Sequence, residues 1–107
     1  MDQQHPIDRL NALIQSRRGA SDAESYTARL LAKGRVECAK KLGEEAVETA
    51  LATAAGDRTA VIRESADLLY HLLVLWAAAE IDPAEVYAEL RARESQSGLQ
   101  EKLKRSR

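Results

Sequence analysis

The stretch between Val61 and Leu75 most constrains the fold, because as a helix it would be apolar on nearly every side. Such a helix is expected at the centre of a helical assembly. Three ionisable residues nevertheless lie in or beside its apolar run: Glu64, Asp67 and His71, at helical positions i, i+3 and i+7. Carboxylates on a buried helix are costly unless they are paired or bind a metal, so this polar stripe is predicted to have a partner.

Composition favours helices over strands along the whole chain. The 107 residues are 45% hydrophobic but only 4% aromatic, so Ala and Leu supply most of the apolar content. Ala and Leu suit helix packing, whereas strands favour β-branched and aromatic residues. We therefore expect one all-α domain, residues 1–107, built as a bundle of four to five helices. Dimerisation would complete it, because the Val61–Leu75 helix has more apolar surface than the other short helices can cover.

Capping signals and glycines divide the chain into five predicted helices. They are Ile7–Arg17, a second helix from a Ser21–Glu24 capping box to Gly34, a third over Val36–Ala55, a fourth from the Asp57 cap to Glu80, and a fifth from the Asp82-Pro83 start to Arg93. A Ser or Asp cap followed by Glu three residues later marks a helix start, and glycine after the last turn marks an end. Residues 97–107 are expected to form an irregular tail.

The third predicted helix carries a second group of carboxylates, at Glu44, Glu45 and Glu48. Each close pair of like charges costs a few tenths of a kcal/mol, and Gly43 costs about 1 kcal/mol relative to Ala. A helix selected only for stability would avoid both features. The alternative is an ordinary solvated acidic face with ion pairs such as Lys41 to Glu45.

Acids on two facing helices would meet in one gap and form a site of hard oxygen ligands. Mg²⁺ suits such a site, because it prefers carboxylates, waters and substrate phosphates. A di-iron bundle would need Glu-x-x-His on two helices, and the chain contains none. One Cys and two His exclude the usual Cys/His zinc site. His71 fits a hydrogen-bonded core histidine better than a metal ligand.

Basic residues close to the acids are candidates for binding phosphate, namely Lys33, Lys40 and Lys41. In a metal–phosphate site the carboxylates hold the metal and the lysines neutralise the remaining phosphate oxygens. Lys40 lies near the centre of the apolar face of its helix. Its alternative role is therefore an aliphatic stem that covers apolar surface while the ammonium group reaches water.

Four segments resemble the phosphoribosyl-ATP pyrophosphatase family, within the MazG superfamily of all-α nucleotide pyrophosphohydrolases. They are residues 25–34 (SYTARLLAKG), 40–49 (KKLGEEAVET), 64–73 (ESADLLYHLL) and 97–102 (SGLQEK). The acidic pattern alone is moderately specific, and the first three segments in this order are strongly specific. The resemblance covers about residues 10–102.

The resemblance implies an enzyme of the second step of histidine biosynthesis, which hydrolyses phosphoribosyl-ATP to phosphoribosyl-AMP and pyrophosphate with Mg²⁺. It implies that Glu45, Glu48, Glu64 and Asp67 are catalytic and bind the metal. Glu44 would join the catalytic set by supporting a second Mg²⁺ or by orienting the attacking water. The family fold would be a helical bundle completed by a second copy. The alternatives are a house-cleaning NTP or dNTP pyrophosphatase of the same superfamily and a non-enzymatic dimeric helical module.

Charge and hydropathy limit the other partners. The net charge of −1 provides no basic excess for a nucleic-acid backbone, and the basic residues 102–107 are interpreted as a solvated terminus. The most apolar run, residues 68–79, is too short to span a bilayer, and the first residues lack the pattern of a signal peptide. Cys38 is the only cysteine and is interpreted as a filler residue. We expect a cytoplasmic homodimer that binds phosphoribosyl-ATP and contacts neither nucleic acid nor membrane.

Overall fold

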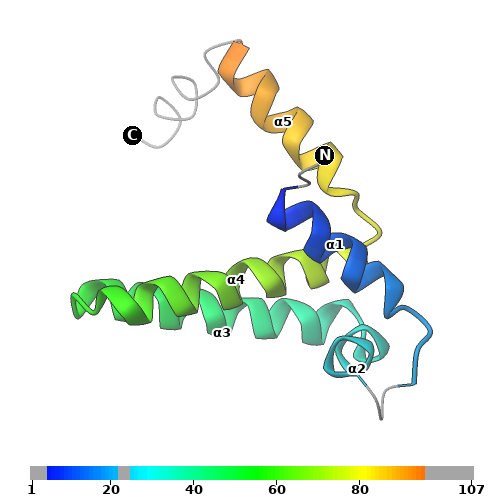
Figure 1. Cartoon of the computed structure of the whole chain (residues 1–107), viewed down its shortest axis with the longest axis horizontal. Coiled ribbons are helices and arrows are strands. Elements are labelled where there is room, and N and C mark those ends of the chain that lie inside the picture. The colour runs from blue at the N-terminus through cyan, green and yellow to red at the C-terminus, as the bar shows by residue number, and fades with distance from the viewer. Residues whose placement is uncertain (1–4, 22–24, 96–107) are drawn as a thin grey trace.

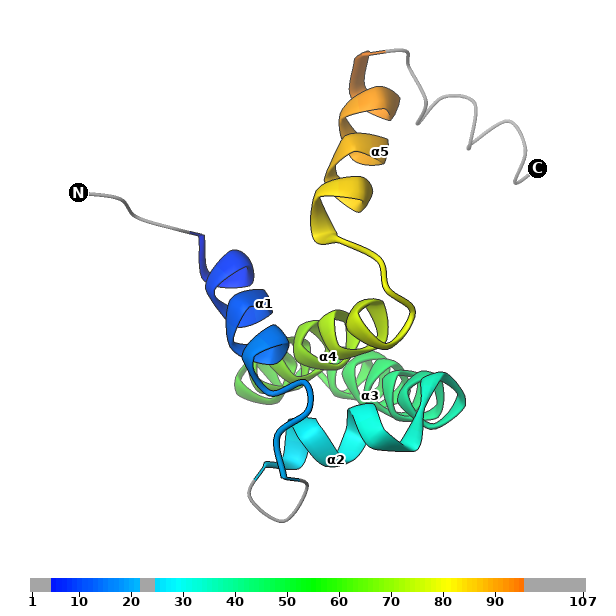
Figure 2. The same cartoon turned by 90° about the vertical axis from the view of Figure 1, so that its right-hand side faces the viewer.

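The computed structural model describes residues 5–21 and 25–95, and its regular structure is entirely α-helical. The helices are α1 (Pro6–Ser16), α2 (Tyr26–Lys33), α3 (Arg35–Ala54), α4 (Arg58–Ala78) and α5 (Pro83–Ser95). Helices α3 and α4 lie side by side as a long hairpin, α1 and α2 pack at one end of it, and α5 projects away (Figure 1 and Figure 2). The predicted all-α class is confirmed. In the described part of the chain, none of the helices combines the length and apolarity needed to cross a lipid bilayer.

The buried core lies at one end of the hairpin only. It contains Ile14, Leu30, Cys38, Leu73, Val74 and Ala77. These residues come from α1, α2, the start of α3 and the second half of α4, so α4 is the central helix, as its apolar sequence predicts. Cys38 fills space in this core, and its thiol lies 3.3 Å from the Leu30 carbonyl oxygen.

The other end of the hairpin keeps large apolar side chains exposed. Val47 and Leu51 of α3 are 58% and 65% exposed, and Ile62 of α4 is 56% exposed. These residues lie on the half of each helix that α1 and α2 leave uncovered. The single chain therefore does not cover all the apolar surface of its two longest helices.

Two of the predicted helix starts agree with the structure. Asp57 Oδ1 accepts a hydrogen bond from the Ala60 amide at 3.1 Å, which caps α4. At α5 the Asp82 amide donates to Glu85 Oε2 at 2.9 Å, and Asp82 Oδ1 accepts from the Ala84 amide at 2.8 Å. These bonds satisfy amides that would otherwise be unpaired in a first helical turn.

The predicted start of α2 is wrong. The helix begins at Tyr26 and is capped by Ser25, whose Oγ accepts from the Ala28 amide at 3.1 Å, and not by Ser21. Ser21 has the stronger local signal, because Glu24 follows it by three residues, whereas Ala28 holds that place after Ser25. Leu30 is only 2% exposed, and its burial against the core fixes which turn is helical. Glu24 of the predicted capping box, like the predicted tail at 97–107, lies outside the described residues.

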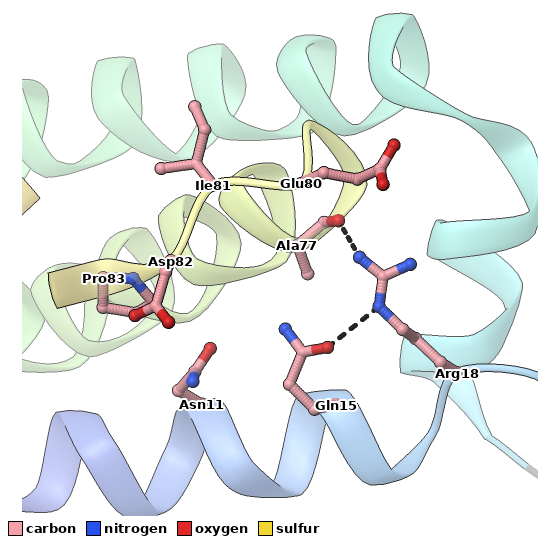
Figure 3. A pocket seen from close by; sticks show the side chains of 8 residues that line it. All are labelled: Asn11, Gln15, Arg18, Ala77, Glu80, Ile81, Asp82 and Pro83. Atoms are coloured by element: carbon pink, nitrogen blue, oxygen red, sulfur yellow. Dashed lines mark hydrogen bonds between the residues drawn. The ribbon is translucent and has the colours of Figure 1, made fainter. Parts of the chain in front are cut away.

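The C-terminus of α1 is fastened to the end of α4 by a single side chain. The Arg18 guanidinium donates one hydrogen bond to the Ala77 carbonyl oxygen and another to Gln15 Oε1 (Figure 3). The Ala77 carbonyl oxygen also accepts from the Glu80 amide at 3.2 Å, so Arg18 adds a charged donor at the negative end of the helix dipole. Helix α5 has its own link to α1, through a 3.4 Å hydrogen bond from the Tyr87 hydroxyl to Asp8 Oδ1.

Candidate metal centre

The hairpin brings together carboxylates from both of its helices. One oxygen each from Glu45, Glu48 and Glu64 all lie within 4.8 Å of one another. Glu45 and Glu48 belong to α3 and Glu64 to α4, because the antiparallel turn at residues 55–57 sets the middle of α3 beside the first half of α4. Three anionic oxygens at this spacing form the kind of donor set that hard divalent cations prefer.

Asp67 and a surface cavity adjoin this group. The cavity has a volume of about 550 Å³ and is lined by Glu48, Leu51, Ala52, Ala60, Arg63, Glu64 and Asp67. Asp67 is one turn along α4 from Glu64 and contributes negative charge that acts on both Glu64 and Glu45. The four acids that the family resemblance assigns to the metal therefore share one region of the surface, and three of them border the cavity.

The acids change each other's proton affinity. Burial raises the pKa of Glu45 to about 7, and the neighbouring Glu48 carboxyl adds to the rise. The pKa of Glu64 is raised as well, by loss of solvation and then by the Glu48 charge. Desolvation and like charges both disfavour the ionised form, so the group holds a proton more readily than separate carboxylates would. A bound cation would relieve the same repulsion.

One oxygen of the group has no partner among the described residues. Glu45 Oε2 is buried and, among the described residues, accepts no hydrogen bond. A buried carboxylate oxygen left unpaired is costly, and native proteins usually satisfy such an atom with a donor, an ion or water. This orphaned oxygen and the donor set around it fit a divalent cation.

The other oxygen of Glu45 faces His71 of α4. His71 Nε2 lies 4.0 Å from Glu45 Oε1, and the histidine is buried, as expected of a core residue. Burial lowers the pKa of His71, which favours the neutral ring. The sequence pattern placed His71 in the polar stripe of α4, but it did not indicate which carboxylate the ring faces.

Glu44 and the predicted phosphate-binding lysines lie outside the group of three. Lys41 Nζ is 3.5 Å from Glu44 Oε1, so Lys41 pairs with Glu44. The alternative of an ordinary acidic face had paired Lys41 with Glu45. Lys41 still acts electrostatically on His71, which keeps it near the site. Lys33 and Lys40 are exposed, and their role in phosphate binding stays a prediction.

Arg63 is a candidate that the sequence analysis missed. It lines the 550 Å³ cavity beside Glu64 and Asp67 and is exposed to solvent. A guanidinium group binds phosphate through several N–H donors at once, so its position suits a polyphosphate ligand. Its spacing could have identified it, because Arg63 stands four residues before Asp67 and so lies on the same side of α4.

A second cavity lies at the opposite end of α4 and contains none of the predicted site residues. Its volume is about 330 Å³, and it is lined by Asn11, Gln15, Arg18, Ala77, Glu80, Ile81, Asp82 and Pro83 (Figure 3). The Arg18 side chain is already hydrogen bonded there to Gln15 and Ala77. The acidic group and its neighbouring cavity are therefore the better candidate for the chemistry.

Comparison with known proteins agrees with the family resemblance. Residues 7–94 match the family described as phosphoribosyl-ATP pyrophosphohydrolase. A protein from Parvibaculum lavamentivorans named phosphoribosyl-ATP pyrophosphatase is 61% identical over 99 residues, which cover 92% of this chain and 91% of the relative. A protein of the same name from Azospirillum brasilense is 52% identical, over 90% of this chain and 86% of the relative. Another, from Methylobacterium nodulans, is 55% identical, over 92% of this chain and 92% of the relative. The chain therefore belongs to the phosphoribosyl-ATP pyrophosphohydrolase family.

Proposed function

We propose that this chain hydrolyses phosphoribosyl-ATP to phosphoribosyl-AMP and pyrophosphate, the second step of histidine biosynthesis. The names of the close relatives support this substrate. The observation that carries the proposal is the set of three carboxylate oxygens within 4.8 Å of one another beside an open cavity. A cytoplasmic location remains the expectation from the sequence.

We further propose that the reaction depends on Mg²⁺ and that Glu45, Glu48, Glu64 and Asp67 hold the ion. The buried, unpaired Glu45 Oε2 and the raised pKa of Glu45 support a cation at this position. Bound Mg²⁺ supplies charge neutralisation for the polyphosphate and for the leaving pyrophosphate. The donors are all carboxylates, which suits this ion better than zinc or a di-iron pair.

The remaining polar residues have roles in binding and orientation. Arg63 and Lys41 bind phosphate oxygens, since both lie near the acids and each carries a full positive charge. Glu44 orients the attacking water, and Lys33 and Lys40 extend the basic surface. Water attacks the α-phosphorus, and the bond from this phosphorus to the oxygen that bridges it to the β-phosphorus breaks. Pyrophosphate leaves with that oxygen, and the proton of the water passes to a carboxylate of the group. No covalent intermediate with the protein is required.

The active form is proposed to be a homodimer. The exposed apolar residues Val47, Leu51 and Ile62 lie on the same half of the hairpin as the acidic group, and Leu51 also lines the cavity. A second copy seated on this surface would remove apolar area from water and narrow the opening of the site. The dimer and the catalytic centre would then share one surface.

Product analysis tests the proposed function directly. The purified chain is incubated with phosphoribosyl-ATP, with Mg²⁺ or with EDTA, and phosphoribosyl-AMP and pyrophosphate are separated by ion-exchange chromatography. Equal amounts of both products in Mg²⁺ and none in EDTA are expected. A panel of NTPs and dNTPs in the same assay separates this activity from house-cleaning hydrolysis. Faster turnover of any of those nucleotides, or no turnover of any substrate, would refute the proposal.

A further inference from the structure

His71 is a buried polar residue for which the proposed reaction has no assigned role. It is 6% exposed and is the only buried polar or charged side chain among those described in residues 5–21 and 25–94. It projects from α4 toward α3, where Nε2 lies 4.0 Å from Glu45 Oε1. A buried imidazole is costly unless its ring nitrogens have polar partners, so the carboxylate it faces is informative.

Aromatic neighbours hold the ring in one orientation. His71 packs edge-to-face with Tyr70, with centroids 5.0 Å apart and planes at 78°, and with Tyr26, at 6.3 Å and 89°. The Tyr70 hydroxyl is also hydrogen bonded to the Thr27 hydroxyl of α2. The rings of Tyr26 and Tyr70 therefore contact the histidine, while its Nε2 faces Glu45.

Glu45 has one oxygen on the histidine side and one oxygen without a partner. Oε1 faces His71, whereas Oε2 is buried and accepts no hydrogen bond from any described residue. A separation of 4.0 Å exceeds hydrogen-bond length, so a hydrogen bond here requires the Glu45 carboxylate to move toward the ring. A donor on Oε1 would leave Oε2 as the atom available to a cation.

We propose that His71 is a positioning residue: its Nε2–H group donates to Glu45 Oε1 and so holds Oε2 toward the cation shared with Glu48 and Glu64. This inference rests on the proposed function, because it assumes a cation at the acidic group. Outer-shell donors of this kind fix the orientation of a ligand, and their loss typically costs 10–100-fold in metal affinity. A histidine that only filled the core would leave metal affinity unchanged when replaced by an apolar residue that packs equally well.

Three substitutions separate these two roles. His71→Phe and His71→Leu remove the donor but keep apolar volume in the core, whereas His71→Gln keeps an N–H donor near the position of Nε2. Tyr70→Phe is the matched control, because it removes the hydroxyl bonded to Thr27 but keeps the ring edge against His71. Each protein is melted in metal-free buffer and then titrated with Mn²⁺ without substrate, with binding followed by electron paramagnetic resonance.

The expected result is a split between metal affinity and stability. His71→Phe and His71→Leu should bind Mn²⁺ about 10-fold or more weakly, with no matching fall in the metal-free melting temperature. His71→Gln and Tyr70→Phe should bind Mn²⁺ close to the wild-type affinity. In a Glu45→Gln background the effect of His71→Phe should disappear, because the amide no longer offers the cation a carboxylate oxygen for His71 to orient.

Several outcomes would overturn the inference. Wild-type affinity in both apolar variants would do so, as would a loss of affinity that follows the melting temperature, or failure of both apolar variants to fold while His71→Gln folds. A wild-type chain that binds no Mn²⁺ would overturn both this inference and the metal centre. A wild-type chain that binds Mn²⁺ but does not hydrolyse phosphoribosyl-ATP would refute the proposed function. The Mn²⁺ affinities of the His71 variants would then still decide whether His71 is a positioning residue.

Discussion

Glu48 of α3 and Glu64 of α4 place carboxylate oxygens within 4.8 Å of each other across the hairpin. Their repulsion opposes folding in the metal-free chain, and an ion that binds only the folded chain removes it. We therefore expect Mg²⁺ to raise the melting temperature. At a concentration 100 times its dissociation constant, the ion would add about 2.7 kcal/mol to the free energy of unfolding. Differential scanning calorimetry in EDTA and in excess Mg²⁺ measures the difference.

Two glutamate-to-glutamine variants make this measurement specific. Glu48→Gln should erase the difference between EDTA and Mg²⁺, because it removes one charge from the group. Glu89→Gln is the matched control, since Glu89 is an exposed residue of α5 that pairs with Arg93. It should keep the full Mg²⁺ response. An equal response in all three proteins would contradict metal binding at the acidic group.

Asp67→Asn should fold normally but be nearly inactive. Asp67 borders the cavity and acts on Glu64 through its charge, so an isosteric amide keeps the volume and removes the negative charge. Loss of about 3 kcal/mol of transition-state stabilisation would lower the rate by about 100-fold or more. The metal-free variant should be at least as stable as the wild type, because the remaining acids repel each other less. Turnover of phosphoribosyl-ATP beside a melting curve in EDTA checks both parts, and near-wild-type turnover would exclude Asp67 from the site.

The helices of this chain were largely predictable because their ends carry strong local signals. Asp57 and the Asp82–Glu85 pair form hydrogen bonds within a few residues, so their effect does not depend on the rest of the fold. The start of α2 was not predictable in the same way. Ser21 has the stronger local signal, with Glu24 three residues later, but the burial of Leu30 against other helices favours a start at Ser25.

The candidate site was predictable at the level of helices but not of individual contacts. Glu45, Glu48 and Glu64 come together because an antiparallel hairpin aligns two acidic faces, which spacing alone suggests. Which oxygen of Glu45 faces His71 depends on the side-chain torsions of both residues, and the His71 ring is packed against Tyr26 and Tyr70. The sequence pattern carries no information on such torsions.

Two glycines should respond in opposite directions to alanine. Gly34 joins α2 to α3 with φ 93° and ψ 177°, a conformation that is nearly restricted to glycine. Gly34→Ala should lower the free energy of unfolding by about 1–3 kcal/mol. Gly43 lies inside α3, and a Cβ atom there would meet no described side chain or packed helix within 4 Å, apart from its own stretch of helix. Gly43→Ala should raise the free energy of unfolding by about 1 kcal/mol.

Urea unfolding of both glycine variants measures these changes. Equal stability of Gly34→Ala and the wild type would mean that the connection between α2 and α3 can relax without strain. A clear loss of stability in Gly43→Ala would contradict the helix-propensity argument and would indicate that a second copy packs against this position.

A charge placed on the uncovered half of the hairpin should disrupt the proposed dimer. Leu51 and Ile62 are 65% and 56% exposed, so Glu at either position costs the single chain little but buries an unpaired charge in an interface. We expect the wild type to sediment at twice the chain mass at micromolar concentration and both variants at the monomer mass. Leu90→Glu is the matched control, because Leu90 is 55% exposed on α5, away from this surface. A wild-type monomer with full activity would contradict the dimer.

The stability of the metal-free chain should fall between about pH 4.5 and 7 because of Glu45. Burial and the neighbouring Glu48 raise its pKa from 4.5 to about 7 in the folded chain. A raised pKa means that the folded state binds the proton more tightly, so this contribution is complete below pH 4.5 and is lost as pH rises through 7. Its size is a few kcal/mol, since one pKa unit corresponds to about 1.4 kcal/mol.

Urea unfolding at pH 5, 6 and 7 in metal-free buffer, with Glu45→Gln as the reference, isolates this contribution from the other carboxylates. The wild type should lose stability relative to Glu45→Gln as the pH rises through this range. Excess Mg²⁺ should reverse the trend, because the ion binds the deprotonated carboxylate and its affinity grows with pH. If the two proteins stay parallel without metal, the Glu45 carboxyl does not titrate with a raised pKa. If the unfolding free energies of the two proteins also change in the same way with pH in excess Mg²⁺, no ion competes with the proton on Glu45.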